Sequence, residues 1–480
     1  MRRLETLLPV FFVAFALPVC LFFALAMPPG QAPDEPAHIA RADSLLHWQI
    51  LGTRRPATSA HVAEAVIRFD PSLLFVTFPF KDNLHLSGMK MTPALQRQLR
   101  AIPWNGARTF SVVNTAVYFP VFYIPSALAI GGTRLLRGSP YDALVAGRLV
   151  NALVYILAGA LALRVAPRGR RLLFALLCLP MTLSLAASFN PDGLLLATMA
   201  LAVALLGRGL EAGANAGRQP GFWIAAAGLA CAFAVKPPYL TFAVLFLLPL
   251  DTLLRRPALL RRRLPALALV VLPALVWSFV ALRYVSVPFT RPAYAPGPLW
   301  PGSHTVLFHA TSPLAQLAVL RADPTRLISL PWRTLFSPGM PGLLWQQMIG
   351  VIGDLDVVLP GWLYGLWSAA LIAAVLGDMA ETEGAGMADI AALLIAAMVC
   401  LLGIYVIEYL TWTNVGRAAI SGVQGRYLLP MLAPLALALP ALHVRNTEPL
   451  RRLCTLVLLA APAAGLFALP HIILAQFYPS

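Results

Sequence analysis

The sequence predicts an all-α polytopic membrane protein: a single integral membrane domain over residues 1–480, with about eleven transmembrane helices and a long first external loop that carries surface helices. Of the 480 residues, 59% are hydrophobic and 12% are charged, whereas soluble domains carry about 25% charged residues. The mean hydropathy is +0.75. The 42 prolines indicate that some membrane helices are broken, because proline frees backbone carbonyls that must then face protein or water.

The first predicted span is residues 7–27, a stretch without a charged side chain that follows Arg2 and Arg3. It is long enough to cross a hydrocarbon core of about 30 Å. The Ala-Leu-Ala ending at 24–26 resembles a signal-peptidase site, but the run exceeds the ~7–15 apolar residues of a cleaved signal, so we expect a retained anchor. Further spans are predicted at 143–163, 172–189, 193–207, 222–235, 238–254, 264–283, 357–377, 388–408, 427–443 and 453–473.

The segment 112–131 decides the topology. Its length suits a span, whereas Pro120 and Pro125 suit a helix that dips into the surface. If it crossed, the arginine-rich loops at 164–171 and 255–263 would lie outside, against the rule that short cytoplasmic loops carry the Arg and Lys excess. We therefore predict that it does not cross and that the N-terminus is cytoplasmic.

Two long external loops follow from this topology, at 28–140 and at about 284–356. Within the first loop, residues 37–48 and 93–99 have the pattern of short amphipathic helices at the membrane surface. The sequence shows no separate soluble domain and no internal repeat.

Composition excludes several classes of protein. The net charge is +16, from 36 basic and 20 acidic residues, but the arginines interrupt apolar stretches instead of forming the basic face of a nucleic-acid binder. The five cysteines make no CxxC pair, which argues against disulfides and thiolate metal sites. No Walker motif, dinucleotide-binding glycine motif or HExxH motif is present.

Ionisable residues gather on the predicted outer side, in five separate places in the sequence. Such residues are costly beside apolar spans, and they usually face a cavity or a partner. Each also has a plainer interpretation: an interfacial carboxylate at a helix start, a turn, a structural counter-ion, or a cation whose stem lies along the membrane interface. The residues are Asp34, Glu35 and His38, then Arg148, Asp192, Lys236, and Arg426 with Tyr427.

These residue types together suit transfer from a lipid phosphate. A carboxylate at the outer surface, Asp34 or Glu35, can act as a general base or hold a divalent cation that activates an acceptor hydroxyl. Arginine and lysine bind phosphate, Arg by a bidentate fork and Lys as a point charge. We therefore predict catalysis by Asp34 or Glu35, donor-phosphate binding by Lys236, Arg426 and Tyr427, support from His38, Arg148 and Asp192, and Asp34 and Asp192 as the ligands of any metal ion.

At these residues the chain resembles the bacterial membrane family called domain of unknown function 2142. The matching pieces are PPGQAPDEPAH (28–38), GRLVN (147–151), FNPDGL (189–194), VKPPYL (235–240) and GVQGRYLLP (422–430). That family in turn resembles the GT-C superfamily of glycosyltransferases, which use polyprenyl-phosphate-linked sugars. The resemblance implies a GT-C-like fold and a protein of the bacterial inner (cytoplasmic) membrane with its site on the periplasmic face.

The resemblance also implies roles for three residues. An acidic residue just after the first transmembrane helix is the catalytic or metal-holding residue of the superfamily, and Asp34 stands there. Asp192 matches the acidic motif after the third helix, and Arg148 matches an arginine in the second. This chain departs from the pattern in having one acid in the second motif and no large C-terminal soluble domain.

The sequence thus predicts a membrane glycosyltransferase that moves a sugar from a polyprenyl phosphate or diphosphate to a cell-envelope glycan, lipid or protein, in contact with the bilayer and without nucleic acid. One alternative is a transporter or flippase of lipid-linked glycans, with Arg148, Lys236 and Arg426 along the path. Such a protein is expected to show repeat symmetry or charges at mid-depth. The other alternative is a polysaccharide polymerase or ligase that relies on arginines of the outer loops.

Overall fold

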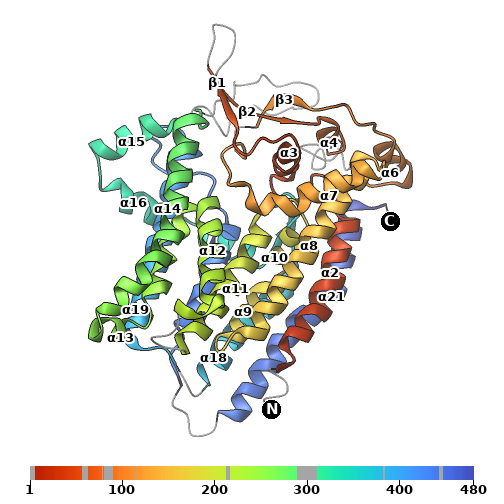
Figure 1. Cartoon of the computed structure of the whole chain (residues 1–480). Helices are drawn as coiled ribbons and strands as arrows, with labels where there is room; N and C mark the ends of the chain where they lie inside the picture. The colour runs from red at the N-terminus through yellow and green to blue at the C-terminus, as the bar shows by residue number, and fades with distance from the viewer. Residues whose placement is uncertain are drawn as a thin grey trace.

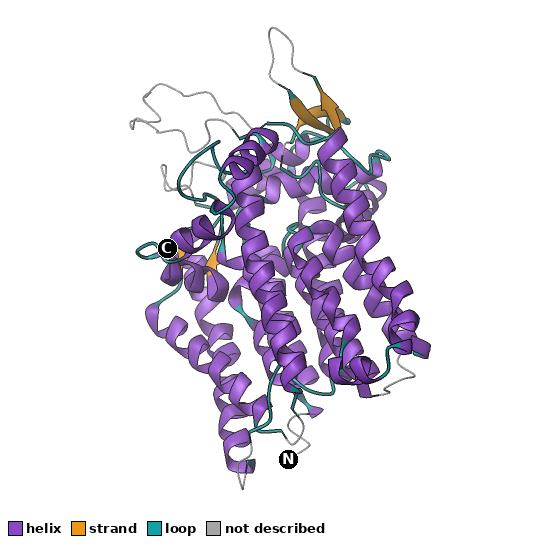
Figure 2. Cartoon of the chain, turned by 90° about the vertical axis from the view of Figure 1, so that its left-hand side faces the viewer, coloured by secondary structure: helices purple, strands orange, loops and turns teal. Residues whose placement is uncertain are grey.

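The computed structural model describes residues 6–479 apart from 57–62, 78, 80–89, 113, 212–216, 289–310, 382–383 and 443–446. It is a bundle of long helices with a layer of short helices and strands at one end (Figures 1 and 2). Among the described residues, seven helices are long and apolar enough to cross a membrane. They are α2 Leu8–Ala26, α8 Pro140–Val165, α11 Asp192–Glu211, α14 Ala258–Tyr284, α18 Gly361–Met379, α19 Met387–Thr411 and α21 Glu448–Phe477.

The other four predicted spans are shorter or broken, and proline is the physical reason. Residues 172–189 form α9 Arg170–Cys178 and α10 Pro180–Ala186, with the break at Pro180. Residues 222–254 form α12 Pro220–Val235, the 3₁₀ helix η3 Pro237–Leu247 and α13 Leu250–Arg255. Residues 427–443 lie mostly in η4 Gly425–Leu428, α20 Leu429–Leu432 and η5 Ala433–Leu437. The structure therefore supports seven of the predicted spans as long helices, and the count of about eleven stays a prediction.

Helix α11 is the most enclosed of the seven, with 72% of its apolar window buried. It packs against α8, α10, α12 and η5. At the other extreme, only 22% of the α14 window is buried, and its exposed side chains are large and apolar, as expected of a face in contact with lipid tails. They include Leu272, Val276 and Phe279.

The first loop folds into a layer over one end of the bundle (Figure 1). The two predicted surface helices are present, as α3 Glu35–Leu46 and α6 Pro93–Arg100. A short helix, α4 Ser72–Phe75, lies with them. A three-stranded antiparallel sheet that the sequence analysis did not predict has the order β1-β2-β3, with β1 Thr53–Arg55, β2 Glu64–Phe69 and β3 Arg108–Ser111. Val66 in the central strand pairs with Thr53 on one side and Ser111 on the other.

The described residues of the ambiguous segment 112–131 form no long helix. They form the 3₁₀ turn η1 Pro120–Tyr123 and the first part of α7 Ile124–Leu135. A helix of 12 residues spans about 18 Å at 1.5 Å per residue, which is less than the ~30 Å of a hydrocarbon core. Helix α7 packs against α3 and α8, and the topology in which this segment does not cross stays a prediction.

The described part of the second loop contributes three helices, α15 Pro313–Ala322, α16 Arg326–Leu335 and α17 Met340–Gly350. A two-stranded hairpin of β4 Val351–Ile352 and β5 Val357–Val358 follows them. Helices α15 and α16 pack on α19, and α17 packs on η4. Helix α17 therefore supports the segment that carries Arg426.

A buried ion pair links three helices at the opposite end of the bundle, where α9 and α21 begin and α18 ends. Arg171 donates to Asp378 at 3.2 Å, and the backbone N–H of Leu172 donates to the same carboxylate at 2.8 Å. Asp378 therefore binds the first N–H groups of α9, which lack partners within the helix. Arg171 also donates to Thr455 at 3.2 Å, so the pair joins all three helices.

Candidate functional site

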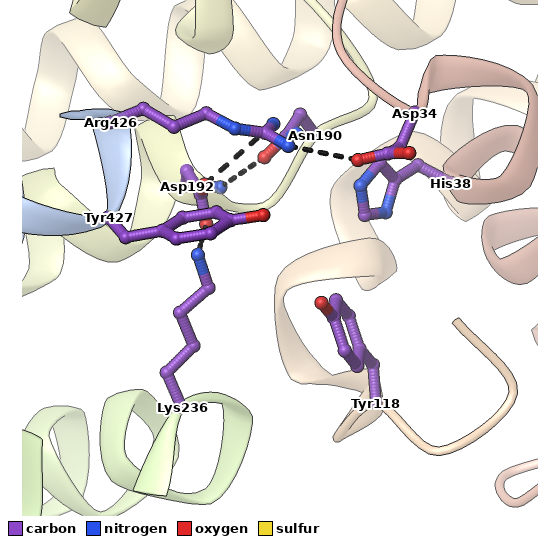
Figure 3. Close-up of a pocket in the computed structure, with 8 residues that line it drawn as sticks. All are labelled: Asp34, His38, Tyr118, Asn190, Asp192, Lys236, Arg426 and Tyr427. Atoms are coloured by element: carbon purple, nitrogen blue, oxygen red, sulfur yellow. Dashed lines mark hydrogen bonds and ion pairs between the residues drawn. The ribbon is translucent and has the colours of Figure 1, made fainter. Parts of the chain in front are cut away.

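The polar motifs of the sequence meet at the end of the bundle covered by the first loop. Eight side chains line one pocket there (Figure 3), and the hollow between them has an empty volume of about 190 Å³, which includes space open to solvent. They come from the start of α3, the turn before η1, the start of α11, the α12–η3 junction and η4. The lining residues are Asp34, His38, Tyr118, Asn190, Asp192, Lys236, Arg426 and Tyr427.

Two carboxylates and two cations are paired across this pocket (Figure 3). Arg426 Nη2 lies 2.9 Å from Asp34 Oδ2, and Lys236 Nζ lies 2.6 Å from Asp192 Oδ1. Arg426 Nη1 lies 4.0 Å from Asp192 Oδ2 and has no hydrogen-bond partner. Arg426 therefore sits between the two acids and keeps one buried N–H group available.

The four charged side chains differ sharply in exposure. The side chain of Asp34 is 44% exposed, whereas those of Arg426 and Asp192 are 2% and 5% exposed. The Lys236 side chain is 16% exposed. Asp34 is thus the charged group of the pocket that solvent or a substrate reaches first.

Asp34 has an unusual backbone conformation. It is the residue before the first turn of α3, with φ 58° and ψ 14°. This left-handed region is costly for most L-residues, but Asp and Asn tolerate it. The carbonyl of Asp34 accepts from the N–H groups of Ala37 and His38 at 3.0 and 3.1 Å, which begins the helix. Such strained positions cluster at functional sites.

Glu35 lies next to Asp34 in the sequence but outside the pocket. Its side chain is fully buried, and Arg148 donates to its two oxygens at 2.8 and 2.5 Å. The N–H of Gly30 donates to it at 3.0 Å, and Arg148 also donates to the carbonyls of Met27 and Pro28. Gly30 has φ +79°, a conformation suited to glycine. Arg148 therefore binds Glu35 and not Asp34, and the pair joins the first loop to α8.

We expect Glu35→Gln to lower protein stability. It leaves Arg148 buried beside a neutral partner, and losing one member of a buried ion pair costs about 3 kcal/mol. The measurement is the apparent melting temperature in detergent. The matched control is Glu448→Gln, whose exposed ion pair with Arg452 contributes less than about 1 kcal/mol. If Glu35→Gln kept its melting temperature but lost activity, Glu35 would instead be a catalytic residue.

The FNPDGL motif holds Asp192 against the loop that carries Asp34. Asn190 Nδ2 donates to the carbonyl of Pro33 at 3.0 Å, and its Oδ1 accepts from the N–H of Asp192 at 2.9 Å. Gly193 lies so close to Ala186 that a Cβ at this position would come within 2.6 Å of its backbone. The motif is therefore a tight turn that also sets the distance between two acids.

The GRLVN motif supports the same turn from α8. A Cβ at Gly147 would come within 2.2 Å of the Phe189 ring, so only glycine lets the ring occupy this position. One helical turn further along, Asn151 Nδ2 donates to the carbonyl of Ser188 at 2.8 Å. Two segments far apart in the sequence thus form one support for Asp192.

The two cations are held by their own neighbours. The Nζ of Lys236 lies 4.4 Å from the centre of the Tyr427 ring, a distance typical of a cation–π interaction. Tyr239 donates to the carbonyl of Tyr427 at 2.7 Å, which ties the VKPPYL motif to η4. Arg426 Nε donates to Gln424 at 2.6 Å. The guanidinium is therefore oriented by a neighbour outside the ion pair.

His38 is buried in the first loop and is held uncharged. Its Nδ1 lies 2.8 Å from the hydroxyl of Tyr123. Burial lowers the pKa of His38 to about 4, against the opposing effect of the Asp34 carboxylate. Burial and the carboxylates of Asp192 and Asp34 raise the pKa of Tyr118. Both rings therefore add neutral hydrogen-bonding groups to the pocket at physiological pH.

Two residues near the pocket were missed by the sequence analysis. Tyr118 lines the pocket but carries no signal in the sequence that separates it from other loop tyrosines. Glu408 lies near the pocket end of α19, where a Cβ on Gly422 would come within 2.7 Å of its Oε2. An acid inside an otherwise apolar span is a signal of a functional site, and that signal could have identified Glu408.

The predicted metal ligands do not form a cation site in this arrangement. Within the described ranges, no group of three or more His, Cys, Asp or Glu residues could hold a metal ion. Asp34 and Asp192 each bind a side-chain cation instead, Arg426 and Lys236.

The fold and the site define a multi-pass membrane protein with a charged pocket at one end of its helical bundle. The chain belongs to the family of predicted membrane proteins DUF2142, whose sequence model matches residues 17–435. The match includes all the pocket residues and confirms the family resemblance. No curated protein and no solved structure matches the chain. The likeness to the GT-C superfamily stays a prediction.

Proposed function

We propose that this protein is a membrane glycosyltransferase that moves a sugar from a polyprenyl-linked phosphate donor to a cell-envelope acceptor on the outer face of the bacterial cytoplasmic membrane. The observation that supports it best is one pocket in which a half-exposed carboxylate, Asp34, lies against the buried cation Arg426. A base and an anion-binding group at contact distance are the two components that such a transfer requires.

In the proposed reaction, Asp34 accepts the proton of an acceptor hydroxyl. The hydroxyl oxygen forms a bond to the anomeric carbon of the donor sugar, and the bond from that carbon to the phosphate oxygen breaks. The bonding electron pair leaves with the polyprenyl phosphate. Arg426 stabilises the charge on the departing phosphate through its guanidinium hydrogen bonds.

The remaining residues have positioning roles in this proposal. Lys236 holds Asp192 and adds positive charge to the phosphate site. Tyr427 lies against Lys236 and fixes its ammonium group. Asn190 fixes the distance between the two acidic loops. The polyprenyl chain would lie in the bilayer beside the exposed apolar faces of the helices.

The distribution of the cations disfavours the transporter alternative. A translocation path needs charges along the depth of the membrane, but Arg148 is closed in an ion pair with Glu35, and Lys236 and Arg426 both lie at the pocket. The polymerase alternative relies on arginines of the outer loops. Of the described residues, the only arginine that lines the pocket is Arg426, from η4.

The test is mass spectrometry of the envelope glycans of a deletion strain. We expect the deletion to remove one sugar substituent, and the unmodified acceptor and unused polyprenyl-linked donor to accumulate. Plasmid-borne wild-type protein restores the substituent, whereas an equally abundant Asp34→Asn protein does not. Identical glycans with and without the gene would contradict the proposed function.

A further inference from the structure

The pocket already holds an anion at its buried arginine, namely the carboxylate of Asp34. We infer that the donor group bound here is a phosphodiester with a single negative charge, as in a polyprenyl monophosphate sugar, and that it replaces Asp34 on Arg426. This inference rests on the proposed function and narrows its substrate class, because a diphosphate-linked sugar carries a second negative charge.

Of the two cations that line the pocket among the described residues, Arg426 alone is available for exchange. Lys236 and Asp192 are both largely buried and lie 2.6 Å apart. Moving either side chain away would leave the other as a buried charge without a partner, which is strongly unfavourable. Arg426 is equally buried, but its partner Asp34 is 44% exposed. Asp34 can therefore move into water, whereas Asp192 cannot.

The guanidinium of Arg426 can bind two phosphate oxygens once Asp34 has moved away. Its Nη1 has no hydrogen-bond partner, and its Nη2 is released when Asp34 leaves. The two groups form the planar fork that binds two oxygens of a phosphate in a bidentate manner. Nε stays bound to Gln424, which keeps the fork oriented during the exchange.

The charges of the pocket favour one negative charge on the ligand. Arg426 and Lys236 face the two carboxylates Asp34 and Asp192, and His38 is neutral because burial lowers its pKa to about 4. When a phosphodiester replaces Asp34, the buried charges still balance. A diphosphate would leave one buried negative charge without a partner, which is strongly unfavourable. The nearby carboxyl group of Glu408 supplies no positive charge to compensate.

The exchange also couples donor binding to catalysis. While Asp34 is bound to Arg426, the guanidinium occupies the carboxylate that an acceptor hydroxyl needs. Once the phosphodiester holds Arg426, the carboxylate is released at the mouth of the pocket. The carboxylate of Asp34 therefore reaches an acceptor hydroxyl only when a donor holds Arg426, so donor binding precedes activation of the acceptor.

The experiment measures binding to the full-length protein in nanodiscs by calorimetric titration. The probes are two methyl esters with the same geranylgeranyl chain, one a phosphodiester and one a diphosphate diester. We expect the phosphodiester to bind wild-type protein more tightly than the diphosphate. We expect Asp34→Asn to bind the phosphodiester about tenfold more tightly than wild type, because it removes the competing carboxylate. Asp34→Gly, which also tolerates the left-handed backbone, is expected to behave in the same way.

The controls separate this effect from others. Asp323→Asn changes an exposed, arginine-paired aspartate outside the pocket, and its affinity is expected to equal that of wild type. Unchanged or weaker phosphodiester binding in both Asp34 variants would overturn the exchange, and tighter binding of the diphosphate would overturn the charge argument. Binding needs no turnover. The transferase proposal therefore fails or stands in the glycan analysis, independently of these titrations.

Discussion

Asp34→Asn is expected to slow sugar transfer by at least about a hundredfold, which is the scale of losing general-base catalysis. The amide cannot accept the acceptor proton, while its size and its tolerance of the left-handed conformation preserve the loop. Donor binding is expected to tighten, because the carboxylate that competes for Arg426 is gone, so the loss is in turnover and not in affinity. The measurement is the initial rate of sugar incorporation by membranes of the deletion strain that contain equal amounts of each variant.

Asp323→Asn is the matched control for Asp34→Asn. Asp323→Asn removes a carboxylate from an arginine pair on the α15–α16 connection, and its rate is expected to match that of wild type. Glu35→Gln is expected to lose activity only in proportion to lost folded protein, because Glu35 lies outside the pocket and is closed by Arg148. A near-normal rate for folded Asp34→Asn would exclude catalysis by Asp34.

Arg426→Lys is expected to weaken apparent donor affinity by about tenfold or more, although the charge is kept. A lysine has no planar fork and cannot bind Gln424 and two phosphate oxygens at once. If Arg426 were only an interfacial cation, lysine would serve equally well. Its 2% exposure already separates it from an interfacial side chain. The measurement is a donor titration on purified protein in nanodiscs.

The control for this variant lies in the same connection between α19 and η4. Arg417 is exposed and donates to Ser421 at 3.4 Å, and it does not line the pocket. Arg417→Lys is therefore expected to leave donor affinity unchanged. Equal affinities for wild type, Arg426→Lys and Arg417→Lys would remove Arg426 from the donor site and leave the transferase proposal without its anion-binding group.

The sequence alone determined that the chain is a polytopic membrane protein, because the length and composition of an apolar run are local properties that need no knowledge of the fold. The surface helices α3 and α6 were predicted for the same reason. The sequence also singled out six of the eight pocket-lining residues, and it included a seventh, Asn190, only within the FNPDGL motif, since ionisable and turn-forming groups stand out against apolar surroundings. Tyr118 was missed because an aromatic side chain in a polar loop has no such contrast.

Only the tertiary structure decided which of these residues act together. Asp34 and Glu35 are adjacent in the chain, yet the αL backbone at Asp34 sends one carboxylate to the pocket and leaves the other buried against Arg148. Arg426 is 392 positions from Asp34, and its choice of partner depends on how α3, α11 and η4 pack. Ion pairs between distant segments are set by three-dimensional distance and by burial, and neither quantity is encoded in the local pattern of the sequence.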